Sequence, residues 1–317
     1  MRLEEAIRQF LLSGKADGWA VTSEAQYRWQ LERWRLAMAE KGIVELEQIT
    51  SVAMREFGAS MADSYAMSTR RVSAISLRAF VKWCFKQQWL PDGDKLASGI
   101  KPPRVPQLCQ RTVSSAEIEK LFLACEEPAA TGLSRALADV ARLRNAAIIS
   151  LLFDSLLRSS ELCRLTTGDL DLERQDVTVT GKGGKREPVR FGPETAERLK
   201  VWLTVRETVA TCDVLFVGIG GNTPGKCLTP SGLRAILRRI GKRAGVKDLS
   251  THAFRRGGAV AQLEAGAPSR LVQMHGRWDN INMVEVYSRQ LEANKLFDRY
   301  SPIGQLSHNG HAREVTR

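Results

Sequence analysis

Residues that could handle a phosphate concentrate between His252 and Tyr287. His252 and Arg255 are three positions apart, a spacing that places two side chains on one face of a helix. Tyr287 follows in a short amphipathic segment, after the sequence HGRW at 275–278. An imidazole, a guanidinium and a phenol in this order predict a phosphate-handling site in which the tyrosine hydroxyl is the nucleophile.

Two earlier elements are suited to bring further cations to such a site. Arg158 precedes Ser159 and Ser160, either of which can cap a following helix, so the guanidinium would lie at the positive end of that helix. The sequences VTVT at 177–180 and VRF at 189–191 flank the turn GKGGK, a pattern typical of a β-hairpin. This turn lacks the GxxxxGK[ST] spacing and no helix follows it, so a nucleotide-binding loop is excluded.

The net charge of the 317 residues is +12, with a sequence pI near 9.7. Both parts of the chain are basic: the net charge is +4 over residues 1–105 and +8 over the remainder. A charge spread in this way favours a nucleic acid bound along the chain over a single basic tail. A generally basic protein with no polyanionic partner is the alternative that the charge alone leaves open.

Composition disfavours several other classes of protein. The six cysteines are scattered without a CxxC pair, and the four histidines occur without an HExxH motif, so we expect reduced thiols and no metal site. No apolar run approaches the roughly 20 residues that span a bilayer. The N-terminus carries acids and lacks a signal-peptide core, so we predict a cytoplasmic protein with no membrane partner.

The length predicts about two domains, and the N-terminal part has helical periodicity. Tyr27, Leu31, Trp34 and Met38 recur at helical steps after Thr22. A shorter helix is expected after residue 51 and a third from about 68 to 88. The third helix carries a basic face formed by Arg71, Arg78, Lys82 and Lys86. A basic face beside an apolar one suits contact with DNA phosphates, and a solvated face is an equal alternative.

A proline-rich stretch at 91–111 predicts extended chain between two domains. The sequence SSAE at 114–117 is a capping-box signature that opens the second domain. A helix is expected around 143–152, another from Pro193, a short strand at 214–217, and a helix from Thr229 and Pro230. That last helix carries five cations that repel one another unless a phosphate backbone lies close: Arg234, Arg238, Arg239, Lys242 and Arg243.

Four short sequences, in this order, resemble the boxes of the tyrosine recombinases, the phage integrase family. LRSSEL at 157–162 is similar to the first arginine box, and TGKGGK at 180–185 resembles the lysine turn of the family's β-hairpin. HAFRR at 252–256 is similar to the HxxR box, and VYSR at 286–289 to the tyrosine box. Each sequence is common alone, but four in order on a basic two-domain chain make chance agreement improbable.

One position departs from the family pattern. Most members carry a histidine nine residues before the tyrosine, and Trp278 stands there in this chain. This resembles the tryptophan variant of Cre recombinase, in which the indole takes the place of the histidine. His275 is the alternative by residue type, but it lies twelve residues before Tyr287. We favour Trp278 over His275 and over a plain core role, because an indole N–H can donate to a phosphate oxygen.

The resemblance implies DNA strand exchange through a covalent 3′-phosphotyrosyl intermediate on Tyr287. The pKa of a free tyrosine is about 10, so this nucleophile needs a base or a strongly cationic site. Arg158 and Arg255 would hold the nonbridging oxygens of the scissile phosphate and stabilise the pentavalent transition state. The linkage keeps the free energy of the broken phosphodiester, so neither ATP nor a metal is expected as a cofactor.

The resemblance also implies roles for the remaining matched residues. Lys182 would be the general acid for the leaving 5′-oxygen, with Lys185 as its rival in the same turn. His252 would accept or shuttle a proton near the nucleophile. Glu161, one helical turn after Arg158, would orient its neighbours rather than react.

The implied fold is mainly α. It comprises a helical core-binding, DNA-binding domain at 1–105, a linker at 106–112, and a catalytic domain at 113–317. The catalytic domain would be mixed but mostly α, with a small antiparallel β-sheet, in the DNA breaking–rejoining enzyme fold. The tail after Tyr287 contains apolar residues that could dock on a neighbouring subunit: Leu291, Leu296, Phe297 and Tyr300.

The expected function is site-specific DNA recombination or integration. A homotetramer would act on specific recombination sites in double-stranded DNA, in the cytoplasm and associated with the nucleoid. Two other functions stay open: DNA relaxation by a monomeric type IB topoisomerase, and non-enzymatic DNA binding on the same scaffold. The complete set of matched residues argues against the non-enzymatic alternative.

Overall fold

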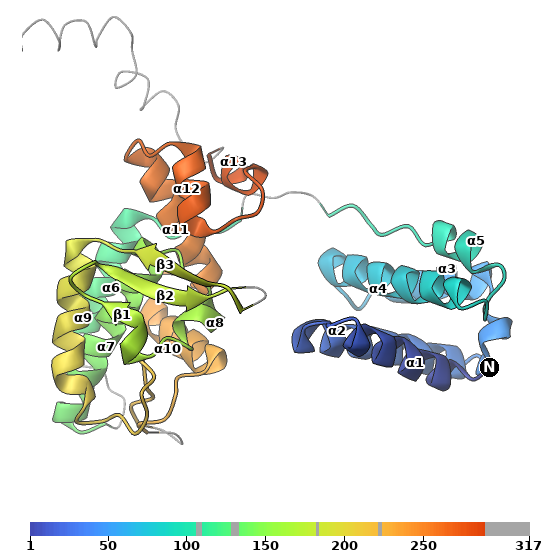
Figure 1. Ribbon diagram of the computed structural model, residues 1–317, viewed down its shortest axis with the longest axis horizontal. Helices are drawn as coiled ribbons and strands as arrows, with labels where there is room; N and C mark the ends of the chain where they lie inside the picture. Colours follow the sequence, from blue (N-terminus) through green and yellow to red (C-terminus); the bar gives the residue numbers. More distant parts are fainter. Residues whose placement is uncertain (106–109, 128–132, 182–183, 221–223, 289–317) are drawn as a thin grey trace, which may run out of the picture. The chain divides into compact units, whose positions relative to one another are not determined.

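The chain divides into two compact units, Met1–Leu108 and Cys109–Arg317, each with its own hydrophobic core. The computed structural model describes residues 1–105, 110–127, 133–181, 184–220 and 224–288 (Figure 1). Both units are mainly helical, and the second also holds a small antiparallel sheet, as the sequence predicted. In the described part of the chain, no helix is long and apolar enough to cross a membrane.

The first unit is an all-helical body. Its elements are α1 (Leu3–Ala16), α2 (Val21–Ala39), a 3-10 helix (Leu46–Gln48), α3 (Ser51–Ser60), α4 (Met67–Lys86) and α5 (Gly93–Gly99). Trp34 of α2 and Phe80 of α4 are fully buried, and Phe10 of α1 meets Phe80 edge to face with 5.6 Å between ring centroids. Aromatic contacts of this kind supply much of the apolar burial that holds three helices together.

The predicted helices of this unit are confirmed, and two further helices were missed. On α2, Leu31, Trp34 and Met38 face the core as the periodicity predicted. Helix α1 was not predicted. Helix α5 lies inside the stretch that was interpreted as extended chain, so that prediction was wrong for residues 93–99. The prolines of the stretch flank this helix instead of interrupting it, and burial of Ala97 against the core favours the helical turn.

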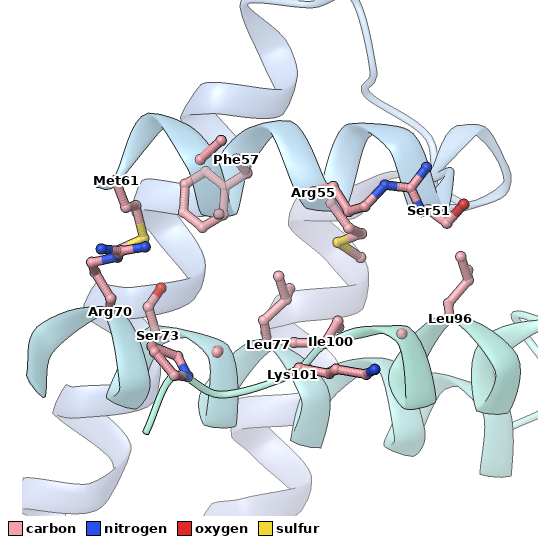
Figure 2. A pocket seen from close by; sticks show the side chains of 16 residues that line it. Ser51, Arg55, Phe57, Met61, Arg70, Ser73, Leu77, Leu96, Ile100 and Lys101 are labelled. Carbon is pink, nitrogen blue, oxygen red and sulfur yellow. The ribbon is translucent and has the colours of Figure 1, made fainter. Parts of the chain in front are cut away.

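A pocket of about 370 Å³ lies in the first unit. Figure 2 shows Phe57 of α3 on the opposite side of it from Leu77 of α4. Ile100 and Lys101, in the chain that follows α5, close its edge. The proline-containing segment is therefore packed against its own unit at this point.

The second unit has a mixed but mostly helical architecture. Its helices are α6 (Ser115–Glu126), α7 (Arg135–Asp154), α8 (Ser159–Leu162), α9 (Pro193–Arg206), α10 (Pro230–Arg243), α11 (Thr251–Glu264), α12 (Ser269–Gly276) and α13 (Asn282–Ser288), with a 3-10 helix at Thr167–Asp169. The sheet has the order β1 (Leu170–Asp171), β2 (Asp176–Thr180), β3 (Arg186–Arg190), with antiparallel neighbours. Val177 pairs with Val189, which confirms the predicted hairpin.

Residues 214–217 are not a strand of this sheet, contrary to the prediction. Val214 and Val217 form isolated bridges with Thr166 and Cys227. Leu215, Phe216 and Val217 are fully buried. The apolar run therefore serves core packing, which sequence alone does not distinguish from a buried strand.

Three helices of this unit begin at defined caps. Ser114 and Glu117 form the predicted capping box, with 3.2 Å from the Glu117 amide to the Ser114 hydroxyl. The Thr229 hydroxyl accepts from the Gly232 amide at 3.1 Å, ahead of the helix that starts at Pro230. For α8 the prediction of a serine cap was wrong, because Arg158 itself occupies the cap position.

Helices α11, α12 and α13 gather at one end of the second unit (Figure 1). A small apolar cluster joins them, formed by Leu156, Ala259, Leu263, Val272, Val284 and Tyr287. Gly258 lets α11 approach the end of α7, since a Cβ there would lie 2.0 Å from the Phe153 carbonyl oxygen. This close packing brings Leu156, which follows α7, to the helices that carry His252, Arg255 and Tyr287.

Candidate active site

One cavity of about 350 Å³ gathers side chains from four separate parts of the second unit. Its lining comprises Gln110, Arg158, His252, Arg255, Arg256, Trp278, Met283 and Tyr287. Five of the seven residues that the sequence suggested for catalysis thus face one space. Of the other two, Glu161 bonds directly to Arg158, and Lys182 lies outside the described residues.

Arg255 is buried and held from two sides. Its two terminal nitrogens donate to the carbonyl oxygens of Leu156 and Gly276. Its guanidinium carbon lies 4.5 Å from the centroid of the Trp278 ring, a cation–π contact. Leu156 adopts a left-handed backbone conformation (φ 54°), which is unfavourable for leucine and is maintained by its complete burial. Arg255 therefore has a fixed position, and the N–H groups that it does not use for the two carbonyls can meet a ligand.

The charge of Arg255 is poorly compensated in the free protein. Burial, followed by the nearby charges of Arg158 and Arg277, lowers the pKa of Arg255 to about 9. Glu161 opposes this shift only in part. A dianionic transition state placed in the cavity would supply the missing negative charge, so the site favours anion binding over its empty state.

Tyr287 lies beside Trp278, with 5.6 Å between the ring centroids. Burial raises the pKa of Tyr287, and the charges of Arg256 and Arg255 only partly reverse the shift. The phenol is therefore protonated at neutral pH and must lose its proton during attack on an electrophile. Gly276 makes room for the indole, because a Cβ at 276 would lie 1.9 Å from the Trp278 ring.

His252 is the nearby group suited to take that proton. Partial burial of its imidazole, followed by the charges of Arg256, Arg255 and Arg158, lowers the pKa of His252 from 6.5. An imidazole with a lowered pKa is neutral at pH 7, and a neutral imidazole can accept a proton.

We expect the pH profile of single-turnover phosphoryl transfer to follow this shift. Since the pKa lies below 6.5, the rate should fall to half of its plateau only at a pH below 6.5. His252→Gln should be slower at every pH and should lose that acidic decline. A wild-type rate that already halves at pH 6.5 would contradict the assignment.

Glu161 connects two arginines. Its carboxylate accepts from the backbone amide and the guanidinium of Arg158, each at 2.7 Å, and from the guanidinium of Arg277 at 2.7 Å. Burial alone would raise the pKa of Glu161, but these bonds and charges outweigh it and hold the pKa below its usual value. The ionised carboxylate thereby fixes the orientation of Arg158 at the start of α8.

Arg277 is a site residue that sequence reasoning missed. It follows α12 in a left-handed conformation (φ 53°, ψ 48°), and its side chain is 12% exposed. This turn aims its guanidinium at Glu161 and leads directly into Trp278. The ion pair therefore ties the loop of the tryptophan to the helix of Arg158.

Replacement of Arg277 by methionine is expected to lower the free energy of unfolding by about 2 kcal/mol, since it leaves a buried carboxylate with one cation instead of two. Phosphoryl transfer should slow about tenfold, because Glu161, which orients the Arg158 guanidinium, loses the second cation that holds it in place. The double variant with Glu161→Gln should lose less than the sum of the two single losses. Strict additivity in chemical denaturation would contradict the coupling, and the exposed Arg270→Met on α12 is the control.

His275, the alternative to Trp278, faces a different groove. Its Nε2 contacts the Arg190 carbonyl oxygen at 3.0 Å, and its Nδ1 contacts the Gln262 side chain at 2.9 Å. Both ring nitrogens are thus occupied in fixing α12 to β3 and α11. The imidazole has a positioning role here, and it does not line the cavity of Tyr287.

The hairpin turn borders this second groove, of about 1350 Å³, which shares Arg158 and Trp278 with the first cavity. Gly181 and Lys185 line it. The Lys185 ammonium is 2.6 Å from Glu187 and its side chain is 76% exposed. Gly181 and Lys185, which lie on either side of positions 182 and 183, therefore border the space beside Arg158, and Lys185 is paired with a carboxylate.

The cations predicted to contact DNA lie mostly at the surface. On α10 all five, Arg234, Arg238, Arg239, Lys242 and Arg243, are exposed, and the opposite face is buried. Within the described residues none of the five is in an ion pair. On α4, Arg71, Lys82 and Lys86 are exposed and Arg78 is half-buried. Arg71 also donates to the Pro103 carbonyl oxygen at 3.0 Å, so it holds the segment after α5 as well.

The sequence is similar to one family of known proteins. The model of the phage integrase family matches residues 111–294. Tyrosine recombinase XerD of Ralstonia nicotianae is 30% identical over 280 residues, which cover 86% of this chain and 85% of the relative. Tyrosine recombinase XerC of Corynebacterium efficiens is 28% identical over 248 residues, which cover 78% of this chain and 75% of the relative.

Solved structures share the fold. A lambda integrase dimer bound to a COC′ core site aligns with a TM-score of 0.71 at 13% identity, over 92% of this chain and 79% of that chain. XerH site-specific recombinase bound to a palindromic difH substrate aligns with a TM-score of 0.67 at 21% identity, over 89% of this chain and 80% of that chain. The predicted mainly α fold is thereby confirmed. The chain belongs to the phage integrase family and is a tyrosine recombinase.

Proposed function

We propose that this recombinase cuts and rejoins double-stranded DNA at specific sites through a covalent 3′-phosphotyrosyl intermediate on Tyr287. The observation that carries the proposal is the cavity that Arg158, Arg255, His252 and Tyr287 line together. Two guanidinium groups, a neutral imidazole and a protonated phenol match the needs of attack on a phosphodiester.

The reaction begins when a scissile phosphate enters between the two arginines. Arg158 and Arg255 donate to its nonbridging oxygens, and His252 accepts the phenolic proton as the Tyr287 oxygen bonds to phosphorus. The bond from phosphorus to the 5′-oxygen breaks, and Lys182 donates a proton to that oxygen. The reverse sequence, with the 5′-hydroxyl of another strand, releases the tyrosine, so the phosphodiester is conserved without ATP or metal.

Trp278 is proposed as the further phosphate ligand, in the manner of the tryptophan variant. Trp278 lines the cavity of Tyr287, whereas His275 lines the neighbouring groove, and this difference supports the choice. The indole also packs against the Arg255 guanidinium and beside the Tyr287 ring, so one side chain contacts both the cation and the nucleophile. Glu161 and Arg277 are proposed to position Arg158.

Domain roles follow from the same proposal. Residues 1–105 form the DNA-binding core-binding domain, 106–112 the linker, and 113–317 the catalytic domain. The basic faces of α4 and α10 contact the DNA backbone. We also propose a homotetramer on DNA, assembled through the tail after Tyr287, whose apolar residues lie outside the described part of the chain. A variant ending at Arg289 should therefore fail to form tetramers on DNA in native mass measurements.

The function is tested with a target duplex recovered by binding selection from random sequences. Plasmids that carry two copies should recombine, and supercoiled plasmids without the sequence should stay supercoiled. Relaxation of the plasmid without the sequence would instead indicate a type IB topoisomerase. Binding without any covalent complex on nicked suicide DNA would indicate a DNA-binding protein that lacks catalysis.

A further inference from the structure

Two cysteines of the second unit lie in contact, although 15 positions separate them in the sequence. The sulfur atoms of Cys212 and Cys227 are 3.4 Å apart. Cys212 is half-buried and Cys227 is exposed. Both lie within the segment between α9 and α10, neither lines the cavity of Tyr287, and the proposed recombination reaction uses neither of them.

The backbone holds this thiol pair together. Val217 forms an antiparallel bridge with Cys227, and the Thr211 amide donates to the Gly225 carbonyl oxygen at 3.0 Å. The Thr211 hydroxyl donates to the same oxygen at 2.9 Å. These main-chain contacts, at Cys227 itself and next to Cys212, hold the backbone at both positions. The approach of the sulfur atoms therefore does not depend on side-chain rotation alone.

The other described cysteines lack these properties. Cys84, Cys125 and Cys163 are buried, and burial raises their pKa values to about 12, 11 and 12. A buried thiol with so high a pKa has almost no thiolate at neutral pH and reacts slowly with oxidants. Among the described thiols, the pair at 212 and 227 is the one that combines access with a partner in contact.

We propose that Cys212 and Cys227 are a redox modification site that forms a reversible intramolecular disulfide by exchange with a low-molecular-weight disulfide. The exposed Cys227 thiolate attacks the small disulfide, forms a mixed disulfide and releases one small thiol. Cys212, after losing its proton, attacks the Cys227 sulfur and releases the second small thiol. Two protein thiols are oxidised, one small disulfide is reduced to two thiols, and no other reactant is needed.

The disulfide closes a loop at the start of α10. Cys227 lies two positions before Thr229, which caps the helix of five exposed cations. Cross-linking removes freedom from the unfolded chain, so the oxidised form should melt about 5 °C higher or more. The hydrogen bond to Cys212 raises the pKa of Cys227, so oxidation should become faster as the pH increases.

The test uses the full chain with Cys109→Ser, since position 109 lies outside the described residues. The protein is incubated with oxidised glutathione, quenched in acid, and treated with N-ethylmaleimide before mass measurement. We expect a loss of two hydrogens, a peptide link between Cys212 and Cys227, and reversal by a phosphine reductant. In the Cys212→Ser variant, one glutathione should instead remain on Cys227.

Three outcomes would overturn the proposal. These are alkylation of both cysteines after oxidation, a link between two chains, and a link of Cys227 to another cysteine. The melting temperature tests the effect of the cross-link. It should rise on oxidation in the protein with both cysteines and stay unchanged in the Cys227→Ser variant. An equal melting temperature in oxidised and reduced protein would overturn the stabilising role.

Discussion

Tyr287→Phe is expected to lower covalent capture of DNA by at least about 10⁴-fold while leaving DNA affinity unchanged. The substitution removes one hydroxyl and keeps the ring that packs beside Trp278. Tyr287 is 5% exposed and belongs to the apolar cluster of α11, α12 and α13, so phenylalanine retains that burial. The measurement is single-turnover cleavage of nicked suicide DNA, resolved by denaturing gel, beside a binding titration.

A matched control separates chemistry from the removal of any phenol. Tyr65→Phe, in the first unit, alters a tyrosine that stacks on Arg33 outside the catalytic cavity. Its covalent capture should match the wild type. Capture by Tyr287→Phe at more than a hundredth of the wild-type rate would show that another group is the nucleophile.

Arg255→Lys is expected to slow the same cleavage by about 10³-fold and also to destabilise the second unit. Lysine keeps the charge, but a single ammonium cannot bond the carbonyls of Leu156 and Gly276 and also present paired donors to a phosphate. Loss of one buried hydrogen bond of this kind costs about 1–3 kcal/mol. The variant should therefore melt several degrees lower than the wild type.

Arg144→Lys is the control for the stability effect. Arg144 is also buried, and its guanidinium donates to the Val217 carbonyl oxygen at 2.9 Å and to the side chain of Asn145. It does not line the cavity of Tyr287. Below the melting temperature of both variants, Arg144→Lys should cleave at the wild-type rate and Arg255→Lys should not. Equal cleavage by the two variants would reduce Arg255 to a structural role.

Sequence predicted the parts of the site that local spacing determines. His252 and Arg255 are three apart on α11, and the hairpin of β2 and β3 depends on neighbouring residues. Such patterns depend on residues that are close in the sequence, so they can be recognised without knowledge of the tertiary contacts. Helix α5 was missed because its flanking prolines were given more weight than the burial of Ala97, which only the folded unit shows.

Contacts between distant elements could not be predicted. Arg277 meets Glu161 only because the turn after α12 is left-handed, a conformation that arginine rarely adopts. The same holds for His275, whose environment is set by Gln262 and Arg190 from other elements. The cap of α8 was missed although its contact is local: the Glu161 carboxylate accepts from the Arg158 amide, so Arg158 occupies the cap position in place of a serine.

The most direct test of the central claim is to identify the residue that becomes bonded to DNA. Wild-type protein is trapped on suicide DNA, digested with protease and nuclease, and sequenced by tandem mass spectrometry. We predict a 3′-linked nucleotide on Tyr287, with none on Tyr27, Tyr65 or Tyr300. A nucleotide on any other residue, or one linked through its 5′-phosphate, would contradict the proposed reaction.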